Sequence, residues 1–351
     1  MRIGMMLSYS GGFADTAAEL IDYEEAGLDL AVVPEAYSFD AVSQLGYLAA
    51  KTTRVELASG IIQLYTRTPT LTAMTAAGLD YVSNGRFCLG IGSSGPQVIE
   101  GFHGVPFDAP LARTRELIEI CRKVWRRETL VHQGKHYQIP LPPEKGTGLG
   151  KPLKIINKPV RDRIPIILGA VGPKNVALAA ELAEGWQPLF YLPERAAAVW
   201  GESLAEGLAK RDPALGALDV MVSAPFAITD DPELAHATHR HALALYIGGM
   251  GAREKNFSNA LVRRYGFEEQ AGLIQDLYLS GRKREAAAAV PDDLVRNTCL
   301  VGPVDHIRER LAVYAAAGVT TLQVAPMAAT HAARVDSIAQ LRDLVDELSQ
   351  D

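Results

Sequence analysis

The 351-residue sequence has few cysteines and no long apolar run, and both shortages exclude large classes of protein. Its three cysteines, Cys88, Cys121 and Cys299, are odd in number and far apart, which excludes a dense disulfide framework and a CxxC metal or redox pair. No apolar run approaches the roughly 18 residues that a membrane-spanning helix needs. We therefore expect three reduced, buried thiols and no membrane segment.

Charge of one sign is not concentrated in any long stretch. The formal net charge is −6, and the basic residues are scattered along the chain, which argues against a nucleic-acid partner or an anionic membrane surface. Residues 1–20 alternate apolar and polar and include Asp15 and Glu19, unlike a secretory signal. These features favour a cytoplasmic protein that binds a small molecule.

Strand-like and helix-like segments alternate from the N-terminus onward. Strands are predicted at 2–9, 28–35, 54–62, 86–93, 164–171, 185–192, 218–229 and 319–327. Helices are predicted between them, for example at 69–83, where Thr68 fits the N-cap and Pro69 the first helical position. Repeated strand–helix units predict an α/β fold, a (β/α)8 TIM barrel that forms a single domain over 1–351.

Two segments interrupt this alternation. Residues 128–163 are rich in proline, glycine and lysine and are too long for an ordinary connection, so we expect a loop-rich insertion after the fourth strand. Residues 230–297 contain helical patterns without a convincing strand, which predicts a helical insertion after the seventh strand.

Gly90, Gly92 and Gly95 match the G-x-G-x-x-G spacing of a dinucleotide-binding loop. In a doubly wound Rossmann sheet, which is the alternative fold, this loop follows the first strand, and an acid follows about 20 residues later. Here the loop follows the fourth strand, and the later position falls in the helical stretch ARTRELIEI. The context favours a loop of the barrel.

The predicted carboxyl ends of the strands are rich in glycine, serine and tyrosine and poor in metal ligands, so no metal site is expected. His236 and His239 share a helical face, but no carboxylate stands at ligand spacing beside them. In ILGAVGPKN, Gly172 opens a helix and Lys174 adds positive charge, which favours a phosphate site. A plain helix start remains the alternative at this point.

Three segments together resemble a known family. They are LASGIIQLYTRTPTLTAM, NGRFCLGIGSSGPQVIEGFHG and ILGAVGPKNVALAAELAEGWQPLF, and their order and both insertions match as well. The chain resembles the luciferase-like superfamily over nearly its whole length, and in particular its actinobacterial coenzyme F420-dependent oxidoreductases. The resemblance implies a barrel that binds F420, transfers a hydride to or from a small organic substrate, and forms a homodimer.

The resemblance also implies where the cofactor lies. A bulge behind the deazaflavin ring, with a cis peptide between Gly60 and Ile61, corresponds to Ser59, Gly60 and Ile61. The ring and its side chain would lie along Gly92, Ser93 and Ser94, and the phosphate against Ala170, Val171, Gly172, Pro173 and Lys174.

The sequence departs from these relatives at the groups that move protons. Glu35 stands where relatives have an acid, but Ala36 replaces a histidine found in several of them, and Gly95 or Pro96 replaces an acid. Glu35 and Tyr37 are the catalytic candidates, although Glu35 could equally bond a loop or cap a helix. Substrate contacts are predicted for Tyr9, Gln63, Tyr65, Gln97 and Tyr191, and His103 is expected to fix a loop.

Two other functions remain open from the sequence. An FMN-dependent monooxygenase of the same superfamily would bind FMN and consume oxygen. A barrel that binds deazaflavin without turnover is conceivable because the histidine and the acid are missing.

Overall fold

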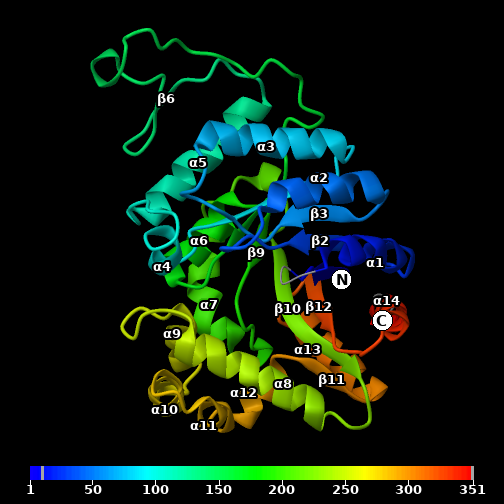
Figure 1. Cartoon of the computed structure of the whole chain (residues 1–351). Helices are drawn as coiled ribbons and strands as arrows, with labels where there is room; N and C mark the ends of the chain where they lie inside the picture. Colours follow the sequence, from blue (N-terminus) through cyan, green and yellow to red (C-terminus); the bar gives the residue numbers. More distant parts are fainter. Residues whose placement is uncertain (9–11, 349–351) are drawn as a thin grey trace.

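The computed structural model describes residues 1–8 and 12–348, and parallel strands there close into a barrel (Figure 1). Around the ring, β12 pairs with β1 and with β10, and β9 pairs with β8 and with β10. The predicted TIM barrel is confirmed. Its strands are β1 (Arg2–Met6), β2 (Leu30–Val33), β3 (Glu56–Ser59), β5 (Phe87–Gly92), β8 (Ile166–Gly169), β9 (Gly185–Gln187), β10 (Asp219–Ile228) and β12 (Thr321–Pro326).

Helices cover the outside of the barrel (Figure 1). Thr68 caps α3 as predicted, because its Oγ1 accepts a hydrogen bond from the Leu71 amide at 3.3 Å, and Pro69 opens the helix. The helices that follow barrel strands are α1 (Phe13–Glu25), α2 (Ala41–Lys51), α3 (Pro69–Val82), α4 (Pro96–Ile99), α5 (Pro110–Trp125), α6 (Pro173–Leu182), α7 (Pro193–Leu208) and α14 (His331–Leu348). In the described part of the chain no helix is both long and apolar enough to cross a membrane.

Two short strands extend the barrel sheet and were not predicted. β4 (Ile62–Gln63) pairs with β5, and β11 (Leu300–Gly302) pairs with the end of β10. Strands of two or three residues carry no periodicity from which a sequence pattern could identify them.

Side chains of the barrel strands alternate between the barrel interior and the layer under the helices. Ile167 belongs to an interior apolar cluster, whereas its neighbours Ile166 and Leu168 belong to the main core. The other members of the interior cluster are Leu30, Val32, Ala58, Cys88 and Met221. All three cysteines are buried and unpaired, and burial raises the pKa of each thiol.

The amino-terminal end of the barrel is charged. Arg2 pairs with Glu56 at 2.6 Å and lies 3.6 Å from Asp219, whose carboxylate accepts a hydrogen bond from the Thr321 hydroxyl at 2.8 Å. These contacts close the end opposite the carboxyl ends of the strands.

The first insertion contains an antiparallel hairpin of β6 (His132–Gln133) and β7 (Gln138–Ile139), followed by the short helix η1 (Pro143–Lys145). Glu116 of α5 holds the hairpin turn by accepting hydrogen bonds from the amides of Lys135, His136 and Tyr137 at 2.9–3.2 Å. The remainder extends away from the barrel at the top of Figure 1.

The second insertion is helical. It comprises α8 (Glu233–Ala244), the π-helix η3 (Leu245–Gly249), α9 (Phe257–Arg264), α10 (Glu268–Leu279), α11 (Lys283–Ala288) and α12 (Asp292–Asn297). β11 and α13 (Val304–Ala316) then lead back to β12, and η2 (Pro213–Leu215) precedes β10.

The histidines of α8 lie within this insertion. His239 is buried with Nε2 2.8 Å from the Thr298 hydroxyl, and burial lowers its pKa to about 4, so its imidazole is neutral near pH 7. His236 is buried as well. Among residues 1–8 and 12–348, no three side chains of histidine, cysteine, aspartate or glutamate are grouped as a metal site.

The backbones of β3 and β5 approach each other closely at Gly90. A Cβ on Gly90 would stand 1.7 Å from the Ser59 carbonyl oxygen, so only glycine fits there. The Ser59 hydroxyl donates to the Gly90 carbonyl at 2.8 Å and accepts from the Gly90 amide at 2.9 Å. This side chain therefore joins the two strands where β3 ends.

We expect Gly90→Ala to lower the free energy of unfolding by about 3 kcal/mol or more, because the added methyl must push backbone apart. Gly201→Ala in α7 is the matched control, since nothing lies within 4 Å of its Cβ position. It should raise stability by about 0.5–1 kcal/mol through helix propensity. Urea denaturation of both variants measures the difference, and equal effects would mean that the two strands separate freely at this point.

Candidate functional site

The carboxyl ends of the barrel strands surround an open mouth. Met6, Gly169, Ser223 and Ala325 occupy inward-facing positions on four strands, and all four are exposed, although their strand neighbours are buried in the core. Three of these four residues are small. In TIM barrels this end carries the chemistry, so the mouth is the candidate site.

The bulge after β3 forms one wall of the mouth. The peptide between Gly60 and Ile61 is cis, as expected, and the chain then rejoins β5 through β4. The Ile61 side chain lies across the ends of two strands: Cβ positions built on Gly92 and Gly169 would be 3.1 and 3.4 Å from it. Glycine on β5 and β8 therefore makes room for Ile61.

The predicted ring-binding residues lie together at this wall, but not all of their side chains are free to contact a ligand. Ser59 is 1% exposed, and its hydroxyl is used in the β3–β5 contact. Ser93 and Ser94 follow β5 and are half-buried, and the Ser93 hydroxyl donates to the Ser94 carbonyl at 3.3 Å. Ser94 has φ 57°, which turns the chain toward α4.

Two buried indoles donate hydrogen bonds to backbone carbonyls of the loop from β8 to α6. Trp186 donates to the Ala170 carbonyl at 2.9 Å, and Trp200 donates to the Val171 carbonyl at 3.1 Å. Arg264 of α9 donates to the same Val171 carbonyl at 3.2 Å. Three side-chain donors thus hold the backbone of this loop.

The start of α6 fits an anion. Gly172 is the N-cap without a side-chain hydrogen bond, and Pro173 occupies the first turn. Lys174 is exposed, and nothing lies within 4 Å of a Cβ on Gly172. Helix N-termini of this kind bind phosphate through free amides. Arg264 adds a cation that the sequence did not indicate, because it lies in the distant helical insertion.

The helical insertion also contacts loops on other sides of the mouth. Lys255 lies over the Phe107 ring, with Nζ 5.5 Å from the centroid, and Tyr246 of η3 packs edge-to-face on Phe190 at 5.2 Å. Together with Arg264, these contacts join the insertion to the loops that follow β5, β8 and β9.

Glu35 lies in the loop after β2, two residues beyond Val33, and is bonded through both carboxylate oxygens. Arg67 donates to Oε1 at 2.6 Å and to Oε2 at 2.9 Å, and the Ala41 amide at the start of α2 donates to Oε2 at 2.9 Å. The side chains of Glu35 and Arg67 are only 7% and 15% exposed. This geometry suits a carboxylate that orders two loops better than one that transfers a proton.

Tyr37 stands at the rim with 63% of its surface exposed, and its hydroxyl makes no hydrogen bond within residues 1–8 and 12–348. Its ring centroid is 6.1 Å from that of Phe102, which lies 5.1 Å from the His103 ring. The Tyr37 hydroxyl is thus exposed in the loop after β2, beside Ala36.

The predicted substrate contacts are only partly at the mouth. Gln63 uses its amide to donate to the Ala36 carbonyl at 2.9 Å. Tyr65 donates to the Asp108 carbonyl at 2.8 Å, and burial raises its pKa to about 12. Gln97 is exposed on α4, and Tyr9 lies outside the described residues.

Tyr191 does not fit the predicted substrate contact. It is 4% exposed, its hydroxyl donates to the Ala317 carbonyl at 2.8 Å, and its ring stacks on Trp200 at 5.6 Å. The sequence pattern extended the sixth strand to 192, but β9 ends at Gln187. Tyr191 therefore lies beyond the strand, in the core under the helices, and we leave it out of the site.

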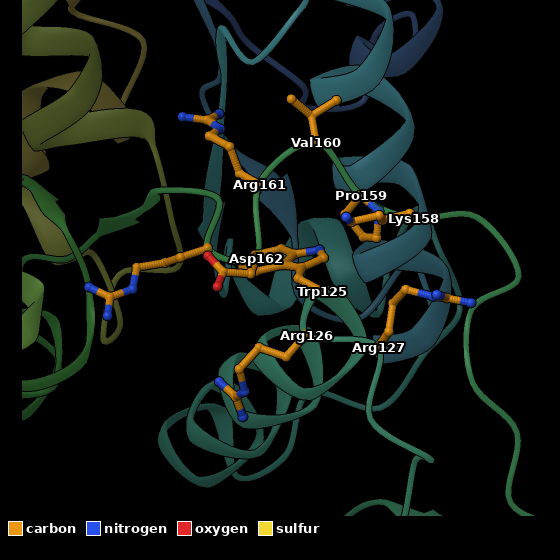
Figure 2. A pocket seen from close by; sticks show the side chains of 9 residues that line it. Trp125, Arg126, Arg127, Lys158, Pro159, Val160, Arg161 and Asp162 are labelled. Carbon is orange, nitrogen blue, oxygen red and sulfur yellow. The ribbon is translucent and has the colours of Figure 1, made fainter.

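A basic hollow lies at the opposite end of the barrel (Figure 2). Arg161 pairs there with Asp80 and donates to the Phe87 carbonyl at the start of β5. Figure 2 shows the guanidinium groups of Arg126, Arg127 and Arg161 pointing in different directions. Arg127 donates to the carbonyls of Ile155 and Ile156 within the first insertion. These cations hold the chain rather than converge on a ligand.

The tight bonding of Glu35 generates a prediction. Arg67→Met should lower the free energy of unfolding by about 3 kcal/mol, because it leaves a buried carboxylate without its cation. The double variant Glu35→Leu with Arg67→Met should recover part of that loss. Chemical denaturation of the three proteins measures both effects. A single variant as stable as the parent would instead support a Glu35 that is free to take up a proton.

Comparison with known proteins agrees with this architecture. A solved F420-dependent tetrahydromethanopterin reductase from Methanopyrus kandleri aligns over 97% of each chain with a TM-score of 0.79 and 21% identity. A solved F420-dependent secondary alcohol dehydrogenase, in complex with an F420–acetone adduct, aligns over 98% of each chain with a TM-score of 0.76 and 16% identity. At these identities the likeness is one of fold.

The sequence comparisons identify the family as well as the fold. A Mycobacterium tuberculosis protein named as a candidate coenzyme F420-dependent oxidoreductase is 46% identical over 349 residues, 98% of each chain. The family model of the luciferase-like monooxygenases matches residues 1–321. The chain therefore belongs to the luciferase-like monooxygenase family.

Proposed function

We propose that this protein binds coenzyme F420 in the barrel mouth and catalyses hydride transfer between the deazaflavin and a small organic substrate. Identity of 46% along the whole chain to a protein named for F420 carries this proposal. The mouth supports the proposal in two ways. Ile61 packs on Gly92 and Gly169 and so forms an apolar wall that suits a planar ring. Lys174 lies in the first turn of α6, which suits a phosphate.

The described residues fit the two ends of such a cofactor. Ser59, Gly60, Ile61 and Gly92 would support the ring, with Ser93 and Ser94 beside its side chain. Ala170, Val171, Gly172, Pro173 and Lys174 would hold the phosphate, with Arg264 fixing the loop from behind. F420, when bound, supplies the carbon centre that accepts or gives the hydride, whereas the protein orients it and excludes water.

We assign proton transfer to Tyr37, because Ala36 stands where several relatives have a histidine. Tyr37 has a free, exposed hydroxyl at the rim and is the proposed donor. Glu35 is proposed to position the loops after β2 and β3 through Arg67. Gln63, Tyr65 and Gln97 remain proposed as groups that shape the substrate side, and Tyr9 is kept from the sequence alone.

Cofactor choice distinguishes this function from the FMN-dependent monooxygenase and is measured by separate fluorescence titrations with F420 and FMN. We expect much tighter binding of F420. Lys174→Ala should weaken it about fivefold, or about 1 kcal/mol, through loss of a charge-assisted contact. Lys210→Ala is the control, because Lys210 pairs with Glu206 at the far end of α7. Equal affinity for both cofactors would contradict the proposal, and binding without turnover would favour the non-catalytic barrel.

We also propose that the protein is a homodimer that pairs through α2 and α3. Four exposed apolar side chains lie on α3: Leu71 at 46%, Met74 at 54%, Tyr81 at 70% and Val82 at 55%. Tyr47 on neighbouring α2 is 46% exposed. A contiguous apolar face of this kind is typical of a protein–protein interface.

The dimer proposal predicts that Met74→Glu shifts the protein from dimer to monomer, because a carboxylate would be buried against an apolar partner. Leu234→Glu on α8, where Leu234 is 80% exposed, should leave the dimer intact. Size-exclusion chromatography with light scattering measures both masses. A monomeric parent protein would refute the dimer, and a dimeric Met74→Glu variant would move the interface to another surface.

Residence in the cytoplasm is proposed from the thiols. Cys88, Cys121 and Cys299 are unpaired and buried, which suits a reducing compartment.

A further inference from the structure

A polar group inside the barrel is not explained by the fold. Gln323 of β12 is 1% exposed, and its Oε1 accepts from the Ser223 hydroxyl of β10 at 3.0 Å and from Gln187 Nε2 of β9 at 3.2 Å. Its Nε2 is buried and has no partner within residues 1–8 and 12–348. Leaving an amide donor unpaired in a core is costly, so a fold optimised for stability alone would not place one there.

The cluster lies below the open mouth and across from the bulge. From β5 to β12 the ring runs through β3, β2 and β1 in one direction and through β8, β9 and β10 in the other, so β12 lies opposite β5. Ser223 is exposed and Gln187 is half-buried, so both reach the space at the mouth. Gly4 makes room for Gln323, since a Cβ there would stand 3.2 Å from its Cγ.

The hydrogen bonds of this cluster have two equivalent arrangements. In the first, Gln323 Oε1 accepts from both neighbours, and Ser223 turns oxygen lone pairs toward the mouth. If both carboxamides rotate by half a turn, Gln323 Nε2 donates to Ser223 Oγ and to Gln187 Oε1, and Gln323 Oε1 becomes the unpartnered atom. Ser223 then has its O–H free, and Gln187 has its NH2 free. The same three side chains thus offer acceptors in one state and donors in the other.

We propose that Ser223 and Gln187 bind the oxygen of an alcohol or carbonyl substrate and that Gln323, which is hydrogen-bonded to both, is the positioning residue. This rests on the proposed function. An alcohol presents an O–H donor and the corresponding carbonyl compound only an acceptor. Oxidation breaks one C–H and one O–H bond and forms the C=O double bond, with the hydride passing to F420 and the proton to solvent water at the open mouth. Reduction reverses these changes. A cluster that exchanges acceptors for donors matches both forms of this substrate, whereas an alkene offers it no oxygen at the reacting carbon.

The test uses the full-length protein loaded with F420 and a panel of secondary alcohols, ketones, imines and activated alkenes, followed by the absorbance of F420. We expect turnover with alcohol–carbonyl pairs. Gln323→Met and Ser223→Ala should each raise KM for these compounds at least fivefold, with a smaller change in kcat. The Kd for F420 should stay within twofold of the parent.

Gln275→Met is the control, because Gln275 is a similarly buried glutamine in α10, away from the mouth. Its KM should be unchanged. Ser223→Ala removes one exposed hydroxyl and tests the cluster even if Gln323→Met does not fold. Unchanged KM in the folded cluster variants would overturn the role of Gln323. Turnover confined to imines or alkenes, or none from F420-loaded protein, would overturn the substrate class. Failure of the parent protein to bind F420 would instead contradict the proposed function.

Discussion

The mouth of this barrel depends on the contact between Ser59 and Gly90. Because Gly90 has no side chain, β3 and β5 approach until the Ser59 hydroxyl bonds both backbone groups of Gly90. A side chain thereby replaces backbone pairing at the end of β3. The chain is free to leave the sheet at Gly60 and return as β4. Ile61 is carried across Gly92 and Gly169 as a result, and the wall of the mouth follows from one close approach.

Contacts between residues far apart in sequence fix the remaining loops. Arg67 holds Glu35 and so joins the loops after β3 and β2, whereas Trp186, Trp200 and Arg264 hold the carbonyls of the loop after β8. Each of these contacts is a hydrogen bond from a guanidinium or indole N–H to a backbone or carboxylate oxygen. Such hydrogen bonds are strong where water is excluded. These contacts order the loops around the mouth.

The barrel itself was predictable from sequence because apolar runs and helix signals such as Thr68–Pro69 repeat at regular intervals. The glycines of the mouth were predictable for a related reason, since close backbone approach needs glycine and leaves a visible motif. Arg67, Arg264 and Gln323 were not identified, because each contacts residues that are far away in the sequence and no local pattern connects them. Tyr191 was misplaced because an apolar run does not show where its strand ends.

The helical insertion meets three separate loops of the mouth through Lys255, Tyr246 and Arg264, although it occupies a single interval between β10 and β12. One interval of the chain thus contacts three sides of the mouth. Because its buried side chains, such as Leu261 and Ile274, pack into the same core as the barrel strands, a change in that stretch links the walls on the sides of β5, β8 and β9 to the stability of the barrel itself.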